Sequence, residues 1–305
     1  MHLKKIIFIV GSTAVGKTSL AIDLAGRING EIVSCDSMQI YKEISIASAK
    51  PSNEQMQGIP HHLVDILSVG EDFDVSQFND LANRAISDIL LRERIPVVVG
   101  GSGMYVQILL DGIFEGGQKN GEVRKKLQER IEQEGNEAVY DELRKVDPKA
   151  AAKIHPNDAR RIVRALEIYQ VTGKPISSLQ KERKGLYDSH EILFFGLERP
   201  RQDLYEVIDR RVEMMFSSGV IDEISQLRNK TLSKTAEQII GVKEIKGLLN
   251  NEYDQDQAQN LMQRNTRHFA KRQMTWFKSD DRIQWLILNE EEGMTPVIER
   301  IMQVI

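Results

Sequence analysis

The sequence of 305 residues predicts an α/β fold built on a parallel sheet, and three observations support that prediction. Short runs of valine and isoleucine alternate with stretches of helical periodicity, which is typical of parallel strands buried on both faces. The first run leads directly into Gly-x-x-x-x-Gly-Lys-Thr at residues 11–18 and then into a helical pattern. A charged stretch of helical period, with no strand candidate, precedes the fourth run. The predicted fold class is a phosphate-loop parallel sheet core flanked by helices, with an all-helical insertion domain.

Four segments are expected to form the strands of this sheet: 4–11 (KKIIFIVG), 30–37 (GEIVSCDS), 95–103 (IPVVVGGSG) and 190–198 (HEILFFGLE). Ligands of parallel α/β sheets bind beyond the carboxyl ends of the strands. The residues that end or follow the first three runs should therefore meet in one crevice: Gly11 to Thr18, Asp36 with Ser37, and Gly100 to Gly103.

The stretch between the third and fourth runs differs in character from its surroundings. It is rich in charge, and its apolar residues recur with helical spacing. Asn157 or Asp158 is expected to cap the helix that carries ARRIVRALEIYQ, and Gly173 is expected to end it. The predicted domains are a catalytic core made of two segments and one helical insertion: 1–115 with 190–305, and 116–189.

Composition excludes several classes of protein. Charged residues make up 28% and hydrophobic residues 41% of the chain, as in ordinary soluble proteins, and no stretch approaches a membrane span. The formal net charge of -4 gives no overall attraction for nucleic acid, so evidence for such a partner has to come from local clusters. The single cysteine, Cys35, cannot form a disulfide within the chain and is expected to be a small buried side chain. We expect a cytoplasmic monomer that does not bind membranes.

The segment from Gly11 to Thr18 predicts a phosphate-binding loop. Its glycines let several backbone N–H groups point inward, and the N-terminus of the following helix adds positive dipole. Lys17 would add a point charge and Thr18 a hydroxyl for Mg²⁺. All eight residues are candidates for binding a diphosphate or nucleotide: Gly11, Ser12, Thr13, Ala14, Val15, Gly16, Lys17 and Thr18. The motif indicates a polyphosphate and leaves open whether that polyphosphate is ATP.

A carboxylate closes the second apolar run at Asp36, where it would stand beside the phosphate loop. A carboxylate between a phosphate cradle and a second substrate is a candidate general base, and a turn or helix-cap aspartate is the alternative. The third run ends in Gly-Gly-Ser-Gly and lacks the acid with which a phosphate-loop kinase holds Mg²⁺. That turn is either a second anion-binding turn or a tight packing turn. His61 and His62 are expected to be loop residues or hydrogen-bond donors that support a site from behind, since the lone cysteine cannot complete a zinc site.

Two basic runs indicate a polyanionic partner. In the first run, arginines share one side of a predicted helix, opposite its apolar residues: Arg160, Arg161 and Arg164 against Ile162, Val163 and Leu166. In the second run, basic residues recur at helical spacing beside three aromatic residues: Arg264, Arg267, Lys271 and Lys278 with Phe269, Trp276 and Phe277. A solvated helix face is the usual alternative for either run. Two such runs on an otherwise acidic chain favour a polyanion.

These motifs together resemble one family, the tRNA dimethylallyltransferases, also called tRNA isopentenyltransferases. The similarity extends over nearly the whole chain, and the joint order of its motifs is far more specific than the phosphate loop alone: GSTAVGKT, DSMQIY, AKP, HHLVDI, GGSGMYV, HPNDARRIVRALEIYQVTGKP, RRVEMM, IIGVKE and TRHFAKRQMTWF. The zinc finger of eukaryotic members is absent, so the resemblance is to the bacterial type.

The resemblance implies transfer of a dimethylallyl group from dimethylallyl diphosphate to N6 of the adenosine immediately 3′ of the tRNA anticodon. The phosphate loop, with Lys17, would then hold the departing diphosphate together with Mg²⁺, while Asp36 takes the proton from N6. Ser102, in place of a family threonine, would set a hydroxyl near the reacting centre, and Arg211 would contact the diphosphate. The adenine has to leave its stack in the anticodon loop to react.

Matching residue by residue, the resemblance also implies contacts with the anticodon stem-loop. The target nucleotide would meet five residues: Asp36, Ser37, Met38, Gln39 and Ser102. Further tRNA contacts would come from six residues of the insertion: Arg124, Arg160, Arg161, Ile162, Val163 and Arg164. The insertion and the core would then grip the stem-loop between them.

The chain departs from the family pattern at positions that leave the proposed base and phosphate ligands in place. They are Ser12 and Val15 in the loop, Ser45, Ala47 and Ser48 in SIASAKP, Val207 in place of a frequent arginine, and Val242 in place of a tyrosine.

Three other functions remain as alternatives from the sequence. An ATP-dependent small-molecule kinase would use Asp36 to activate a hydroxyl. A non-catalytic RNA-binding module would carry a vestigial phosphate loop. An enzyme that prenylates free adenine nucleotides would have no use for the insertion or the basic stripe.

Overall fold

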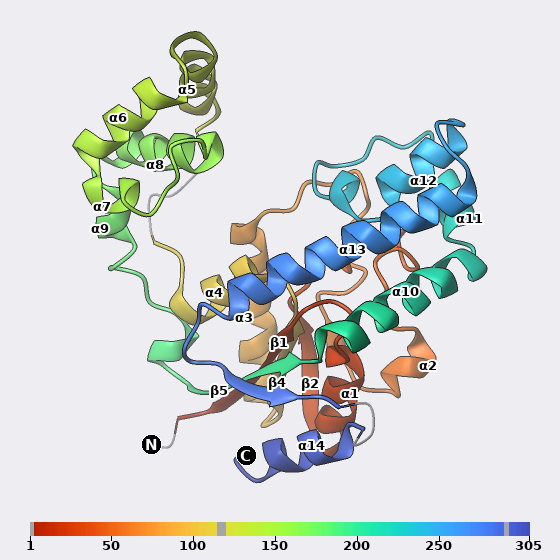
Figure 1. Cartoon of the computed structure of the whole chain (residues 1–305). Helices are drawn as coiled ribbons and strands as arrows, with labels where there is room; N and C mark the ends of the chain where they lie inside the picture. Colours follow the sequence, from red (N-terminus) through yellow and green to blue (C-terminus); the bar gives the residue numbers. More distant parts are fainter. Residues whose placement is uncertain (1–2, 115–119, 290–292) are drawn as a thin grey trace. The chain divides into compact units, whose positions relative to one another are not determined.

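The computed structural model describes residues 3–114, 120–289 and 293–305 and divides the chain into two compact units. The first unit is formed by Met1–Leu109 and Ser189–Ile305, and the second by Leu110–Asp188. The boundary expected between residues 115 and 116 lies outside the described residues. Figure 1 shows the elements of both units, coloured along the sequence from red at the N-terminus to blue at the C-terminus.

A parallel sheet of six strands forms the centre of the first unit, in the order β3-β2-β4-β1-β5-β6. The strands are β1 (Lys5–Gly11), β2 (Gly30–Ser34), β3 (His61–His62), β4 (Ile95–Gly100), β5 (Glu191–Glu198) and β6 (Gln284–Ile287). The parallel α/β fold class predicted from the sequence is confirmed. The four predicted strands are present, whereas the two edge strands β3 and β6 were missed.

Of the two alternatives for the histidines, the loop was wrong, because they form strand β3. His61 and His62 pair in parallel with Ile32 and Val33 of β2. The Nε2 atom of His62 lies 2.7 Å from a carboxylate oxygen of Glu31. A strand of two polar residues carries no apolar run, so only its pairing with β2 reveals it.

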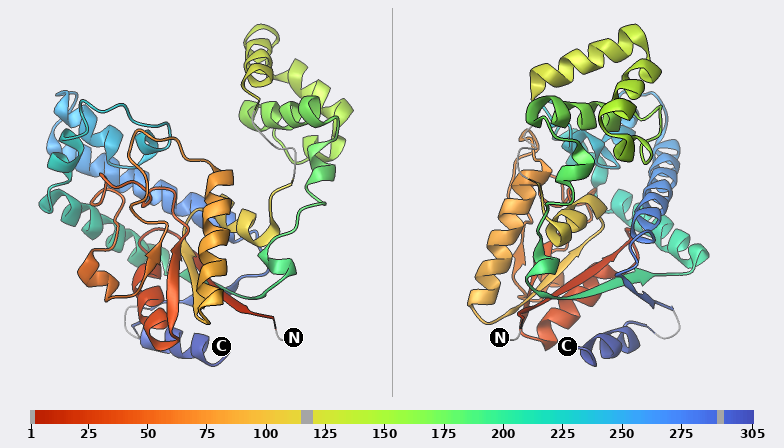
Figure 2. Two further views of the ribbon diagram at one scale, coloured as in Figure 1. Left: turned by 180° about the vertical axis from the view of Figure 1, so that it is seen from behind. Right: turned by 90° about the vertical axis from the view of Figure 1, so that its left-hand side faces the viewer.

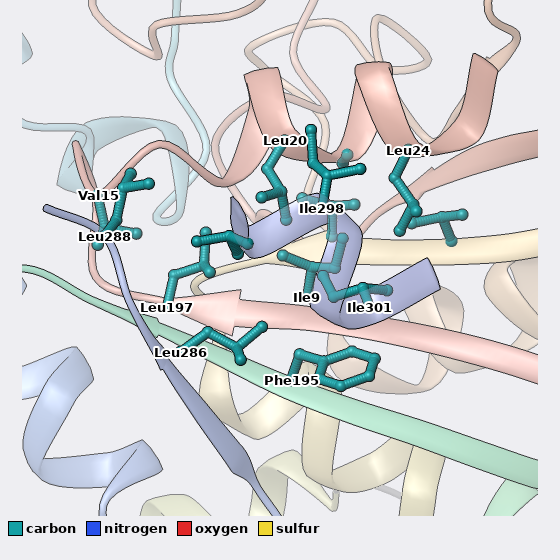
Figure 3. Close-up of a cluster of buried hydrophobic side chains, with 14 of the residues drawn as sticks. Ile9, Val15, Leu20, Leu24, Phe195, Leu197, Leu286, Leu288, Ile298 and Ile301 are labelled. Atoms are coloured by element: carbon teal, nitrogen blue, oxygen red, sulfur yellow. The ribbon is translucent and has the colours of Figure 1, made fainter. Parts of the chain in front are cut away.

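The central strand β1 places successive side chains on opposite faces of the sheet. Ile9 belongs to the buried cluster shown in Figure 3, whereas Phe8 meets the ring of Phe194 edge-on, with 5.8 Å between the ring centroids. Every residue from Ile6 to Gly11 is buried. This burial on both faces is the physical reason why the strand carries no polar side chain after Lys5.

Helices cover the sheet and fix the positions of the residues that follow its strands. Those that begin in the first unit are α1 (Lys17–Arg27), α2 (Asn53–Met56), α3 (Val75–Leu91), α4 (Gly103–Asp111), α10 (Arg201–Ser217), α11 (Val220–Ser225), α12 (Val242–Leu249), α13 (Gln255–Phe277) and α14 (Thr295–Met302), with a short 3₁₀ turn at Ala236–Gln238. In Figure 3, Leu20 and Leu24 of α1 face Ile298 and Ile301 of α14 across the cluster that also contains Ile9.

Helix α3 packs against β2 and β4 and lies along the sheet in Figure 2. It buries Phe78, Ala82 and Ile86, which recur every four residues and therefore share one face. Its start is fixed by Asp74, whose carboxylate accepts hydrogen bonds from the backbone N–H groups of Ser76 and Gln77. The amphipathic pattern and the cap together explain why this segment is a helix.

The second unit is helical, and its described residues include no strand. Its elements are α5 (Gly121–Glu134), α6 (Asn136–Val146), α7 (Pro148–Ala151), α8 (Ala159–Thr172), α9 (Ile176–Leu179) and a 3₁₀ turn at Leu186–Asp188. Asp158 caps α8 by accepting the N–H of Arg161, and Gly173 ends it with a φ of 71°. The helix ends predicted from the sequence are therefore confirmed. Leu127, Val139 and Leu166 are among the residues of its small apolar core.

Candidate active site

The segment between β1 and α1 forms a loop whose shape depends on its glycines. Gly11 has a φ of 144° and Gly16 a φ of 108°, a region that side chains rarely tolerate. A Cβ atom on Gly11 would lie 2.6 Å from the carbonyl oxygen of Leu197 on β5. Gly16 directly precedes α1, so the N–H groups of the first helical turn are available to an anion.

Two residues of the loop point into the protein. Val15 is fully buried and packs in the apolar cluster near Leu288, as Figure 3 shows. Ser12 is also fully buried, and its Oγ atom meets no hydrogen-bond partner in the described part of the chain. The side chain of Val15 therefore holds the loop against the core, and the predicted ligand contact of this residue stays a prediction for its backbone N–H.

A cavity of about 780 Å³ opens beside this loop, and we call it the reaction cavity. Eight of the predicted site residues line it: Thr13, Ala14, Gly16, Lys17, Thr18, Asp36, Gln39 and Arg211. Gly100 lines it too, so residues that end or follow β1, β2 and β4 meet in one place, as the sequence predicts. Lining residues that the sequence did not single out as site residues include His61, Arg199, Val207 and Gln273.

Lys17 and Arg211 bring two cations into the reaction cavity. The Nζ atom of Lys17 donates a hydrogen bond of 2.6 Å to the carbonyl oxygen of Ser12. Burial lowers the pKa of Lys17 to about 8, the nearby charge of Asp36 opposes that shift, and Arg211 adds to it. Burial also lowers the pKa of Arg211, again against the effect of Asp36. One carboxylate therefore stands within electrostatic reach of both cations.

The carboxylate of Asp36 combines a turn with a place in the cavity wall. Its Oδ1 atom accepts a hydrogen bond of 2.9 Å from the backbone N–H of Met38. This contact is the local turn that the sequence offered as an alternative role. The same side chain lines the reaction cavity with Lys17, so the turn orients the carboxylate and does not remove it from the site.

Ser102 lies beside the Asp36 segment but outside the described wall of the reaction cavity. Its Oγ atom accepts a hydrogen bond of 3.2 Å from the backbone N–H of Ser37 and lies 3.4 Å from that residue's hydroxyl. Its own N–H donates to the carbonyl oxygen of Cys35. Gly100 permits this approach, because a Cβ atom there would lie 1.9 Å from the same oxygen. Ser37 and Met38, like Ser102, do not contribute to the cavity wall.

Gln273 on α13 joins the phosphate loop to the glycine-rich turn after β4. Its Oε1 atom accepts a hydrogen bond of 2.7 Å from the N–H of Thr13, and its Nε2 atom donates one of 3.0 Å to the carbonyl oxygen of Gly101. Gln273 lies within the motif TRHFAKRQMTWF, but no role was predicted for it from the sequence. The available signal was a glutamine on the same helical face as Ala270 and Phe277, both of which are buried.

The SIASAKP segment is fixed by a residue from a distant helix. Both carboxylate oxygens of Glu223 on α11 accept backbone N–H groups of residues 45–47, at 2.7 to 2.9 Å. Ser48 and Ala49 of this segment line the reaction cavity, and the carbonyl oxygen of Ala49 accepts a hydrogen bond from Arg211. The substitutions at 45, 47 and 48 therefore leave a backbone-held loop at the cavity edge. Val242 is buried in the core.

The arginines of the insertion that were predicted to contact tRNA fall into two groups, one exposed and one paired with a buried carboxylate. Arg160 and Arg161 are exposed on α8. Arg124 and Arg164 each donate a hydrogen bond of 2.8 Å to the buried carboxylate of Glu167. Burial of Glu167 acts to raise its pKa, but the hydrogen bonds from the two arginines outweigh burial and hold this pKa below its usual value. Glu167 thus ties the two inner arginines to the helices of the insertion.

Two further predicted contacts of the insertion lie in its core. Ile162 is 0% and Val163 is 4% exposed, and both belong to the apolar cluster of this unit. Their side chains pack against the other helices of the insertion, so the expectation that they contact RNA applies at most to their backbone.

The basic run of α13 is partly neutralised by acidic residues of its own unit. Arg267 donates to the carboxylate of Asp209 at 2.6 Å, and Lys278 pairs with Glu198 at 2.5 Å. Phe277 is buried, whereas Trp276 is 40% exposed. The stripe predicted from helical spacing therefore packs against α10 and β5 at two of its four positions.

None of the described helices combines the length and the apolar character that a membrane crossing needs. In the same residues, no three His, Cys, Asp or Glu side chains gather as a metal cluster.

A phosphate loop after the central strand, and an acid that closes a strand of the same parallel sheet, define a phosphate-loop α/β protein with a cavity suited to a polyphosphate. The model of the family described as IPP transferase matches residues 39–280. The chain belongs to this family.

Relatives and solved structures agree with that assignment. The tRNA dimethylallyltransferase of Halothermothrix orenii is 45% identical over 93% of this chain and 88% of its own length. That of Caldanaerobacter subterraneus is 43% identical over 98% and 96%. The crystal structure of the Bacillus halodurans tRNA isopentenylpyrophosphate transferase matches with a TM-score of 0.72 at 37% identity, covering 98% of this chain and 96% of that one. A eukaryotic dimethylallyltransferase described as acting on tRNA matches with a TM-score of 0.82 at 33% identity, covering 98% of this chain and 78% of that one.

Proposed function

We propose that this protein transfers a dimethylallyl group from dimethylallyl diphosphate to N6 of the adenosine 3′-adjacent to the anticodon of tRNA, with release of diphosphate. One observation supports this proposal most directly: Lys17, Arg211 and Asp36 line the same cavity beside a phosphate loop. Two cations suit a departing diphosphate, and a carboxylate suits the removal of a proton from an amine.

The donor reacts by loss of its diphosphate. The bond between C1 of the dimethylallyl group and the diphosphate oxygen breaks, and both electrons of that bond leave with the oxygen. Lys17, Arg211 and the N–H groups at the start of α1 stabilise the negative charge that develops there. Because the cavity is lined by protein, these charges act more strongly than they would in water.

The acceptor is an amine of low nucleophilicity, because the lone pair of N6 is delocalised into the purine ring. The new bond forms between N6 and C1, and the nitrogen then loses a proton. The carboxylate of Asp36 accepts this proton, held in orientation by the N–H of Met38. The adenine enters the cavity after it has been flipped out of the anticodon loop.

The residues present fit a magnesium ion bound through the donor. Thr18 places a hydroxyl in the wall of the reaction cavity next to Lys17, and hard oxygen ligands are those that Mg²⁺ prefers. Thr18 would hold the ion together with oxygens of the donor's diphosphate. The ion would neutralise charge on the leaving diphosphate.

The tRNA contacts are proposed on the exposed cations of the insertion and on the segment after β2. Arg160 and Arg161 are exposed and suit phosphate oxygens, while Gln39 reaches the cavity wall from the Asp36 segment. We propose that the bound element is the anticodon stem-loop, and that the protein acts as a monomer in the cytoplasm.

The decisive experiment combines purified protein, dimethylallyl diphosphate, Mg²⁺ and unmodified tRNA, with nucleoside analysis by mass spectrometry. We expect N6-isopentenyladenosine in the tRNA. Turnover of ATP with a metabolite acceptor would instead identify a kinase. Binding of tRNA that survives loss of Lys17 and Asp36, with no modified nucleoside in the wild type, would identify an RNA-binding module. Modification of free adenine nucleotides but not of tRNA would overturn the proposed acceptor.

A further inference from the structure

Arg199 follows the last residue of β5 and reaches the phosphate loop from that strand. It lines the reaction cavity together with Lys17 and Arg211. Its Nε atom donates a hydrogen bond of 3.2 Å to the carbonyl oxygen of Val15. A Cβ atom added to Gly16 would lie 4.0 Å from its Nη2 atom. The guanidinium group therefore lies directly against the phosphate loop.

One donor of this guanidinium group has no partner in the described part of the chain. The Nη1 atom of Arg199 is buried and meets no hydrogen-bond acceptor among residues 3–114, 120–289 and 293–305. A buried charged donor without an acceptor is unfavourable, and such groups in native proteins usually have a reason. The neighbouring cavity offers that reason, because an anion bound at the loop would bring acceptor oxygens to the guanidinium group.

We propose that Arg199 binds the diphosphate in the reaction cavity, as a further cation beside Lys17 and Arg211. This inference rests on the proposed function, since it assumes that the cavity holds a diphosphate. The planar guanidinium group can hold the loop through Nε and offer the remaining N–H groups to phosphate oxygens. Arg199 thus couples the position of the loop to the presence of its ligand.

The sequence at position 207 supports this role. The chain carries Val207 where the family resemblance has a frequent arginine, and Val207 lines the same cavity as Arg199. Replacement of arginine by valine on α10 removes one cation from the cavity wall. Arg199 supplies a cation to that cavity from the end of β5 instead.

The test measures binding of inorganic diphosphate with Mg²⁺ by titration calorimetry, without tRNA. We expect Arg199→Gln to weaken binding by about tenfold or more and Arg199→Lys to weaken it less, because a lysine keeps the charge but not the planar fork. The control is Arg201→Gln, since Arg201 is outside the reaction cavity and stacks on Tyr205 at 5.1 Å. Its affinity for diphosphate should stay within about twofold. Equal affinities for Arg199→Gln and Arg201→Gln would overturn the inference.

Steady-state kinetics give a second readout that a purely structural role would not produce. Arg199→Gln should raise KM for dimethylallyl diphosphate more than it lowers kcat, with KM for tRNA unchanged. Adding Val207→Arg to Arg199→Gln should restore part of the lost diphosphate affinity. A folded double variant with no recovery would overturn the idea that Arg199 stands in for an arginine at 207.

Lys17→Met separates this inference from the proposed function. If the wild type does not bind diphosphate, or binds it equally well without Lys17, the proposed use of the phosphate loop fails. If binding depends on Lys17 but not on Arg199, only the role of Arg199 fails.

Discussion

The side chain of Gln273 accepts a hydrogen bond of 2.7 Å from the backbone N–H of Thr13, across 260 positions of the chain. The same amide donates to the carbonyl oxygen of Gly101. One buried side chain on α13 therefore sets the spacing between the phosphate loop and the turn that follows β4. Asp36 lies in the same cavity wall. The spacing set by Gln273 therefore also affects the distance between Asp36, the proposed base, and a diphosphate held by the phosphate loop.

Replacing Gln273 with alanine should damage both stability and donor binding. The change leaves the N–H of Thr13 and the carbonyl of Gly101 without their partner, which costs about 1–3 kcal/mol for a buried group. We expect the free energy of unfolding in urea to fall by that amount and KM for dimethylallyl diphosphate to rise. Gln263→Ala is the matched control, because Gln263 is also buried on α13 but donates to Asp209. That variant should lose stability without a change in KM, and equal KM values for both variants would contradict the role of Gln273.

Replacing Asp36 with asparagine should abolish turnover while the site stays assembled. The amide oxygen can still accept the N–H of Met38, so the turn is kept, but the side chain can no longer take a proton. We expect the single-turnover rate to fall by about 100-fold or more. The affinities for diphosphate and tRNA should stay within about tenfold. A large loss of tRNA affinity with little loss of rate would make Asp36 a binding residue.

The affinity for dimethylallyl diphosphate should depend on pH through Lys17. Burial places the pKa of this lysine at about 8, so the ligand-free protein loses the cation as the pH rises through that value. Binding then requires uptake of a proton, and the affinity should fall by up to about tenfold per pH unit above 8. Lys17→Arg keeps its charge throughout this range and should show a flat profile. Parallel profiles for lysine and arginine would exclude Lys17 as the titrating group.

The two exposed arginines of α8 should contribute to tRNA binding without supporting the fold. Arg161→Gln is expected to weaken tRNA binding and to lower the slope of log affinity against log salt by about one unit. The free energy of unfolding should stay within about 0.5 kcal/mol of the wild type. Arg144→Gln on α6 is the matched control, since Arg144 is exposed and paired within three residues, as Arg161 is. If both variants shift the salt slope equally, the contact with RNA is not specific to α8.

Arg124→Gln should behave differently from Arg161→Gln. Arg124 shares the buried carboxylate of Glu167 with Arg164, so its loss leaves that carboxylate with fewer donors. We expect a lower thermal midpoint for the insertion in addition to weaker tRNA binding. An unchanged midpoint would show that Arg164 and the N–H of Asn120 satisfy Glu167 without Arg124.

Local signals in the sequence were sufficient for the central strands and the phosphate loop. The run that became β1 is buried on both faces and continuously apolar from Ile6, and the two glycines of the loop both have a positive φ. The edge strands β3 and β6 were missed because strands of two and four residues carry too little pattern of their own. Their identity comes from pairing with β2 and β5.

Position in the sequence was a weaker guide to the role of individual side chains. Val15 belongs to the phosphate-loop motif but packs into the core, and Ile162 and Val163 sit between arginines but fill the centre of the insertion. Conversely, Gln273 and Arg199 belong to the reaction cavity although neither was assigned a role from the sequence, even though Gln273 lies within the motif TRHFAKRQMTWF. Burial separates these groups, and burial depends on neighbours that are distant in the chain.

The sequence by itself determined the parallel α/β fold class, the phosphate loop at residues 11–18 and the candidate base at Asp36. Each of these follows from periodicity or from residue types at fixed spacing, which are properties of a short segment. Only the tertiary structure decided which side chains enclose the cavity with them. Arg199 and Gln273 reach it from elements nearly 200 or more positions away, and no local pattern encodes such contacts because they arise when separate elements pack. Arg211, which the family resemblance implied as a diphosphate contact, reaches it in the same way.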